Sequence, residues 1–202
     1  MYKIATTLFV LGTFLISCKN DPGINSDEEE SQIAFNLPAG FVLEDLYQPS
    51  SNEQGSWVAL AQGPKDIIYA CDQYGKIYYF NAPAIDTKLD TKDVHALDLE
   101  IGEAHGMLWA FNSLYVAVNK SWENDVPDEL ENGSGVYRIT DTDQDGNLDT
   151  VEMLLKLEGS GEHGPHSLVL SPDGKEIYFI AGNHVLIPEA IKENSRLPIN
   201  WA

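Results

Sequence analysis

The sequence predicts an all-β fold, because short β-rich segments separated by turn residues make up the chain behind residue 36. β-branched and aromatic residues dominate these segments, and glycine, proline, aspartate and asparagine stand between them, as is typical of strands joined by tight turns. Helical periodicity is scarce, and only residues 188–194 are expected to form a helix. The expected strands cover residues 56–60, 67–71, 76–80, 108–119, 135–140, 150–157, 167–170 and 176–181.

A loose internal repeat groups these strands into units. Similar combinations of strand, turn and aromatic strand begin near Trp57, His105 and His166, at a spacing of about 50 residues, which is typical of β-propeller blades. Residues 37–202 would then hold about three blades, whereas a closed ring takes roughly 4–8. We therefore expect a partial β-propeller, from a truncated product or one part of a larger gene. An all-β sandwich with coincidental spacing is the alternative.

The first residues have the pattern of a cleaved export signal. Lys3 is followed by thirteen apolar or small residues, Ile4 to Ile16, too few to span a bilayer core, which takes about 20 in helical form. The segment 15–18 (LISC) resembles the bacterial lipobox. We expect cleavage after residue 17, lipid on Cys18, and export to the outer membrane, facing the periplasm or the surface. An ordinary signal peptide with an incidental cysteine is the alternative.

The composition limits the partners of the exported chain. Residues 19–31 are polar, acidic and free of aromatic side chains, so we expect residues 18–36 to be a flexible tether. The net charge of −20 argues against nucleic acid as a partner and against direct binding to anionic lipid. With Cys18 committed to lipid, Cys71 has no disulfide partner. Cys-x-x-Cys-His is absent from the sequence, so no c-type haem is attached to this chain.

An acidic loop at residues 141–152 satisfies the calcium-loop pattern in full. Gly146 allows the sharp turn that the loop needs. The flanking segments look like strands, so we expect a structural ion outside a helix–loop–helix hand, and this strand context leaves the last carboxylate in doubt. A solvated hairpin whose aspartates only make turns is the alternative. The expected ligands are Asp141, Asp143, Asp145, Asp149 and Glu152.

Four segments together resemble one family: 54–58 (QGSWV), 72–78 (DQYGKIY), 159–166 (GSGEHGPH) and 181–184 (AGNH). It comprises the large propeller proteins known as membrane-bound dehydrogenases, or haem-binding-domain proteins, of Planctomycetes and Bacteroidetes. The resemblance covers roughly residue 37 to the end of the sequence. More distantly, the propeller is similar to the quinoprotein glucose and sorbosone dehydrogenases. These resemblances imply oxidation of a sugar or alcohol with pyrroloquinoline quinone, and electron transfer to a fused or partner cytochrome c.

The quinoprotein resemblance also implies roles for three histidines. His163 stands nine positions before Pro172 of a Pro-Asp-Gly turn, the place of the catalytic base in those enzymes. Neutral imidazole suits removal of an alcohol proton near pH 7. His166 and His184 would then help to hold the cofactor. The resemblance is incomplete, because residues 165–167 (PHS) replace the Gly-Gly-Arg that follows the family's histidine, and no basic residue is evident there for a quinone carboxylate.

Two other interpretations of the histidines stay open. The imidazoles of His105, His163, His166 and His184, with the carboxylate of Glu162, are ligand types that Zn²⁺ or Fe²⁺ accepts. The same side chains also suit hydrogen bonds between blades. For the whole chain, the alternatives to a dehydrogenase-like protein are a non-catalytic, calcium-braced module that binds a carbohydrate or protein at the cell surface, and a truncated chain without activity of its own.

Overall fold

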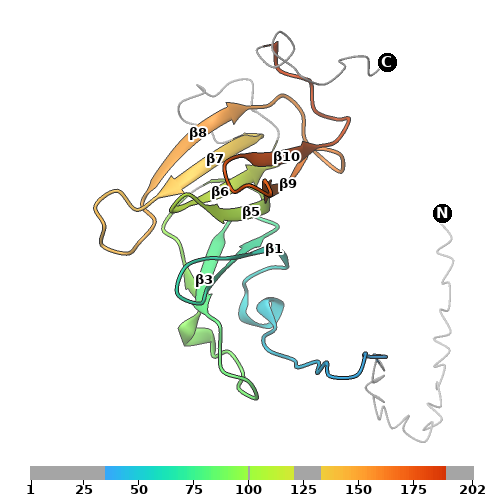
Figure 1. The fold of residues 1–202 in the computed structure, drawn as a ribbon, viewed down its shortest axis with the longest axis vertical. Helices are drawn as coiled ribbons and strands as arrows, with labels where there is room; N and C mark the ends of the chain where they lie inside the picture. Colours follow the sequence, from blue (N-terminus) through green and yellow to red (C-terminus); the bar gives the residue numbers. More distant parts are fainter. Residues whose placement is uncertain (1–34, 100, 121–132, 190–202) are drawn as a thin grey trace, which may run out of the picture. The chain divides into compact units, whose positions relative to one another are not determined.

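The computed structural model describes residues 35–99, 101–120 and 133–189, which form an all-β protein of antiparallel strands (Figure 1). The chain divides into two units, residues 1–43 and 44–202. In the described part of the first unit, the Phe41 N–H donates to the Pro38 carbonyl at 3.1 Å. The expected signal, Cys18 with its expected lipid, most of the expected tether and most of the expected helix lie outside the described residues. No helix of the described part is long and apolar enough to span a membrane.

The first sheet contains four antiparallel strands in chain order, which confirms the three strands expected in this region. A short 3-10 helix, η1 (Pro49–Asn52), precedes the sheet, and another, η2 (Thr91–Asp93), precedes its last strand. That last strand is only two residues long and has no recognisable sequence pattern. The strands are β1 (Trp57–Gln62), β2 (Ile67–Asp72), β3 (Ile77–Asn81) and β4 (His95–Ala96).

The second sheet repeats the arrangement of the first, with four antiparallel strands in chain order. The single strand expected at residues 108–119 is wrong, since the chain turns back at Phe111 and Asn112, which have φ angles of 50° and 55°. A two-residue turn with positive φ at both positions matches the twist of a hairpin. The strands are β5 (Ala104–Ala110), β6 (Ser113–Val118), β7 (Gly135–Thr140) and β8 (Thr150–Lys156).

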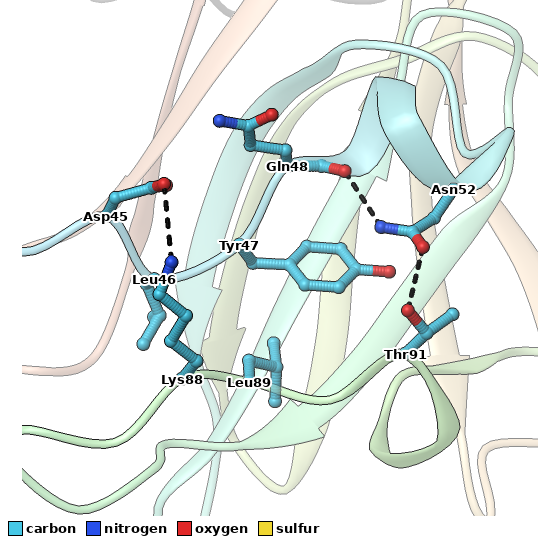
Figure 2. A pocket seen from close by; sticks show the side chains of 8 residues that line it. All are labelled: Asp45, Leu46, Tyr47, Gln48, Asn52, Lys88, Leu89 and Thr91. Carbon is cyan, nitrogen blue, oxygen red and sulfur yellow. Dashed lines mark hydrogen bonds and ion pairs between the residues drawn. The ribbon is translucent and has the colours of Figure 1, made fainter.

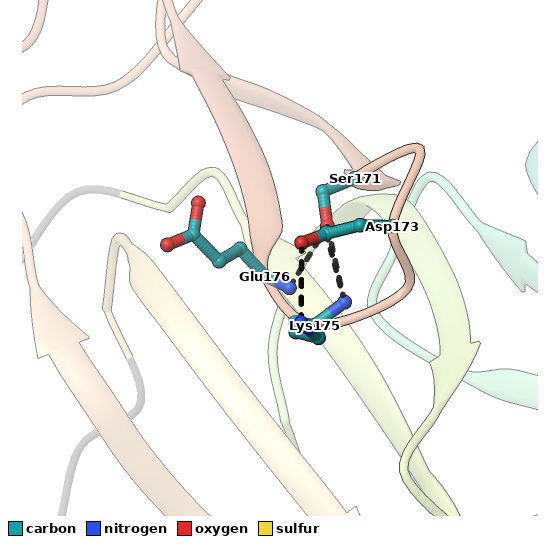
Figure 3. A network of polar contacts seen from close by, with 4 residues as sticks. All are labelled: Ser171, Asp173, Lys175 and Glu176. Carbon is teal, nitrogen blue, oxygen red and sulfur yellow. Dashed lines mark hydrogen bonds and ion pairs between the residues drawn. The ribbon is translucent and has the colours of Figure 1, made fainter.

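The third sheet is a hairpin of β9 (Pro165–Leu170) and β10 (Ile177–Ala181). Its connection holds the expected Pro-Asp-Gly turn, and Figure 3 shows the polar contacts that close it. The Ser171 hydroxyl donates to Asp173 Oδ1 at 2.7 Å and accepts from the Glu176 N–H at 2.9 Å. These bonds fix the chain reversal between the two strands.

The first strands of the three sheets lie in a row, with β5 packed against both β1 and β9 (Figure 1). The main core lies between the first two sheets and includes Ile77, Val116 and Tyr137. Cys71 belongs to it and is fully buried, and its thiol lies 3.1 Å from the Ala104 carbonyl and 3.9 Å from that of Ala59. A second cluster, which includes Leu168, joins the second and third sheets.

Each first strand also carries a β-bulge near its start. The strand pairing skips one residue in each case: Val58 in β1, His105 in β5 and His166 in β9. Bulges bend a strand and re-aim the side chain of the extra residue. The bulges therefore place two histidines at equivalent positions of neighbouring sheets.

Candidate functional site

A cleft of about 580 Å³ opens where β5 begins, β6 ends and the loop before β9 runs past them. His105 and His166, the bulge residues of the second and third sheets, both line it, and their ring centroids are 5.9 Å apart. The structure thus brings together two of the histidines that the sequence singles out. The lining residues are Glu103, His105, Asn119, Lys120, Ser160, Gly161, Glu162 and His166.

Asn119 fixes the protonation of His105. This asparagine is only 3% exposed, and its Nδ2 donates to the Gly161 carbonyl at 2.8 Å and lies 3.2 Å from His105 Nδ1. Because an amide nitrogen only donates, His105 Nδ1 is the acceptor and the ring proton is on Nε2. Burial lowers the pKa of His105, the neighbouring His166 lowers it further, and Glu103 opposes both effects. His105 is therefore a neutral hydrogen-bond donor at neutral pH.

His166 carries a proton on the same ring nitrogen and directs it to the backbone of Glu162. Its Nε2 lies 3.0 Å from the Glu162 carbonyl oxygen. A carbonyl oxygen only accepts, so His166 Nε2 is the donor in this contact and Nδ1 is the acceptor nitrogen of the neutral ring. In their neutral forms the two imidazoles thus differ in what they offer: His105 has its Nε2–H, and His166 has the lone pair of Nδ1.

His163 and His184 form a second histidine pair outside the residues that line the cleft. Their rings stack at a centroid distance of 4.7 Å and an interplanar angle of 24°. His163 Nδ1 lies 2.6 Å from Asn183 Oδ1. Because Oδ1 only accepts, the proton of a neutral His163 is on Nδ1, and Nε2 keeps its lone pair. Asn183 therefore holds His163 in the tautomer that a general base needs.

Three of the five expected calcium ligands come together in the acidic loop between β7 and β8. Oxygen atoms of Asp141, Asp143 and Asp149 lie within 4.8 Å of one another. Asp141 Oδ2 accepts from the Gly146 N–H at 2.9 Å, whereas its Oδ1 is buried and has no hydrogen-bond partner within the described ranges. A buried carboxylate oxygen without a partner is costly, and a cation bound at this cluster would satisfy it. The residues therefore fit a Ca²⁺ ion.

The other two expected ligands have different partners. Asp145 accepts from the backbone N–H of Asn147 at 2.7 Å and from its side-chain amide at 3.0 Å. Glu152 lies in β8 directly opposite Arg138 of β7 and forms an ion pair with it. The structure thus directs the Glu152 carboxylate to Arg138 and does not place it in the three-aspartate cluster.

The histidines do not assemble into a comparable metal site. Across the part of the chain that the structure describes, the three aspartates are the only group of three histidine, cysteine or acidic side chains whose ligand atoms lie this close. His105 and His166 form one pair, and His163 and His184 form another. The zinc or iron interpretation therefore lacks a third ligand within the described residues.

A second pocket, of about 320 Å³, lies where the segment before β1 meets the segment before η2 (Figure 2). In it the Asn52 side chain joins the two segments by bonds of 2.9 Å to the Gln48 carbonyl and 2.8 Å to the Thr91 hydroxyl. The ring of Tyr47 stacks on Trp57 of β1 at 5.3 Å. These contacts attach the segment before β1 to the first sheet. The lining residues, which no sequence motif connects, are Asp45, Leu46, Tyr47, Gln48, Asn52, Lys88, Leu89 and Thr91.

The fold and the site define an all-β protein that carries a histidine-containing cleft between two of its sheets. Comparison with models of known protein families and with curated protein sequences finds no match to this chain.

Proposed function

We propose that this chain is the N-terminal propeller portion of a lipid-anchored, dehydrogenase-like protein. Two four-stranded antiparallel sheets and a further hairpin follow one another along the chain, each with its strands in chain order. Their first strands pack side by side, and each has a bulge at the same position. Repeated sheets joined through their first strands are the arrangement of propeller blades. This repetition supports the propeller over a sandwich of two sheets.

The part of this chain in such a protein is to bind the sugar or alcohol on which the intact protein acts. The observation that carries this proposal is the cleft in which His105 and His166 present a donor and an acceptor beside two carboxylates. Calorimetric titration of the full chain in detergent with D-glucose and D-sorbitol, without any redox cofactor, tests it. Binding of either compound supports the proposal, and heat changes no larger than those of dilution for both would contradict it.

A second candidate function is that this chain itself catalyses the oxidation with His163 as base, as the quinoprotein resemblance implies. The bond between His163 Nδ1 and Asn183 favours it, because Nε2 is left as the atom that would take the hydroxyl proton. Pyrroloquinoline quinone carries three carboxylates, and neither the described contacts of His163, which are Asn183 and His184, nor the lining of the nearby cleft fit it. Glu103 and Glu162 would repel these groups, and Lys120 is the one cationic side chain among the described lining residues.

Dye-linked oxidation of D-glucose separates the two candidates. If His163 is a base, activity with added pyrroloquinoline quinone falls by at least about 100-fold in His163→Ala, the lower end of what general-base catalysis contributes. The matched control is His95→Ala, since His95 is an exposed histidine of β4 in the first sheet. The proposed binding function predicts no quinone-dependent activity in the wild-type chain, and activity that depends on His163 would favour the second candidate.

The structure also supports a structural calcium ion at Asp141, Asp143 and Asp149. We expect Ca²⁺ at 100 times its dissociation constant to stabilise the folded chain by about 2.7 kcal/mol. Asp141→Asn is expected to abolish this gain, because it removes a charge from the cluster. Glu152→Gln is the matched control and keeps the gain, since its carboxylate is paired with Arg138. Melting curves in Ca²⁺ and in EDTA measure both effects, and coincident wild-type curves would contradict the site.

A further inference from the structure

We propose that the cleft between the second and third sheets binds a neutral ligand with adjacent hydroxyl groups. In this proposal His105 donates from its Nε2–H and His166 accepts at Nδ1, while Asn119 is a positioning residue that holds His105 in the required tautomer. The inference rests on the proposed binding function and deepens it by naming the chemistry of the ligand and the groups that recognise it.

The backbone sets the two imidazoles side by side. Both histidines are the extra residues of β-bulges at equivalent places in adjacent first strands, and their rings are 5.9 Å apart and tilted by 34°. Hydroxyls on neighbouring carbons can reach both rings, since each hydrogen bond spans about 2.8 Å. The equivalent bulge of the first sheet carries Val58 instead. Of the three equivalent positions, only the two that face this cleft carry a group able to bind a hydroxyl.

The backbone at Gly161 and Gly164 fixes the side chain of Asn119, and Asn119 in turn fixes the tautomer of His105. Its side-chain nitrogen bridges the Gly161 carbonyl and His105 Nδ1. A Cβ added to Gly164 would lie only 2.1 Å from Asn119 Oδ1, so the chain passes this amide at a position that has space only for glycine. Oδ1 itself is buried without a hydrogen-bond partner in the described part of the chain. A constrained, buried side chain of this kind is typical of a residue that positions a binding group.

The charges of the cleft favour a neutral ligand. Glu103 and Glu162 line it together with Lys120, so acidic residues outnumber the one basic residue with a fixed positive charge among the described lining residues. Carboxylates accept hydrogen bonds from hydroxyl groups and repel phosphate or carboxylate ligands. The described lining residues include no phenylalanine, tyrosine or tryptophan on which a large planar ligand would stack. A sugar or sugar alcohol therefore matches the cleft better than a phosphorylated or acidic one.

The test is a titration of the full ¹⁵N-labelled chain in detergent with D-glucose and D-sorbitol, followed by spectra of the histidine ring nitrogens. We expect His105 in the Nε2–H tautomer, and signal shifts at His105 and His166 as ligand is added. His105→Phe and His166→Phe are each expected to weaken binding at least tenfold. His95→Phe is the matched control and leaves affinity unchanged, because His95 lies in the first sheet and contacts Tyr79. Glucose 6-phosphate is expected to bind at least tenfold more weakly than glucose.

Asn119→Asp tests the positioning role without removing either histidine. A carboxylate beside His105 Nδ1 favours a proton on that nitrogen, so the spectrum is expected to change tautomer and affinity to fall at least tenfold. An unchanged tautomer and affinity would overturn the role of Asn119. Glucose binding that neither phenylalanine variant weakens would overturn the cleft assignment and leave the proposed function standing. No binding of glucose or sorbitol to the wild-type chain would overturn the proposed function as well.

Discussion

Replacing Gly106 by alanine is expected to lower the free energy of unfolding by about 3 kcal/mol or more, at the upper end of overpacking effects. A Cβ at this position of β5 would lie 1.9 Å from the carbonyl oxygen of His166 and 3.2 Å from the Ser167 Cα. Both are backbone atoms of β9, so no side-chain rotation relieves the clash, and the two first strands would have to separate. Chemical denaturation followed by circular dichroism measures the loss.

Gly174→Ala is the matched control for this substitution. Gly174 also has no side chain, but nothing lies within 4 Å of an added Cβ, and its φ of +70° gives the only penalty. That conformational penalty is about 1 kcal/mol. If Gly106→Ala were no less stable than Gly174→Ala, β5 and β9 would not approach each other as described. Gly106 follows His105, and the backbone atom that its added Cβ would meet belongs to His166, so the substitution also bears on the two histidines of the cleft.

Replacing Asp72 by alanine is expected to destabilise the chain by about 3 kcal/mol, because it leaves buried donors without an acceptor. Asp72 is only 3% exposed. Its Oδ1 accepts from the backbone N–H groups of Tyr74, Gly75 and Lys76 at 2.8, 2.8 and 3.0 Å, and its Oδ2 accepts from the Tyr78 hydroxyl at 3.2 Å. One carboxylate thus holds the whole turn between β2 and β3. Urea denaturation of the variant measures the effect.

Tyr78→Phe is the control that removes only the longest of these bonds, and we expect it to cost about 1 kcal/mol. Equal stability of the Asp72→Ala and Tyr78→Phe variants would show that the turn does not depend on the carboxylate.

The pKa of Tyr78 tests the same contact independently. Burial, and then the charge of Asp72, raise the pKa of its hydroxyl from 10.0 to about 12. Stability is therefore expected to decrease as the pH rises above 10, because the unfolded chain loses this proton first. Asp72→Asn should lower the pKa of Tyr78, which an ultraviolet titration detects.

Much of the strand pattern could be predicted, because apolar and β-branched runs between turn residues depend only on local sequence. Residues 67–71 and 135–140 are strands almost to the residue. The hairpin turn at Phe111 and Asn112 could not be predicted, since phenylalanine rarely adopts a positive φ. The strand at His95 forms because it pairs with Tyr79 of β3. A strand of two residues has no periodic pattern, so this pairing could not be predicted from the sequence.

The candidate site was predictable in its residue types and much less in its geometry. The glycine-rich stretch around His163 and His166 and the acidic loop are visible as motifs. The pairing of His105 with His166 depends on bulges, which exist only once strand register is known. The same limit applies to Glu152, whose ion pair with Arg138 follows from the cross-strand register. Asn119 has no motif around it, and only its burial beside His105 reveals its role.

The reactivity of the buried Cys71 thiol reports how often the first two sheets separate. It lies in β2 with the Ala59 carbonyl of its own sheet on one side and the Ala104 carbonyl of the next sheet on the other. Burial raises its pKa to about 12, so the reactive thiolate is almost absent at neutral pH in the closed structure. A thiol reagent can modify Cys71 only in those moments when the first two sheets part. The rate at which a thiol reagent modifies Cys71 therefore measures how often the core between these two sheets opens.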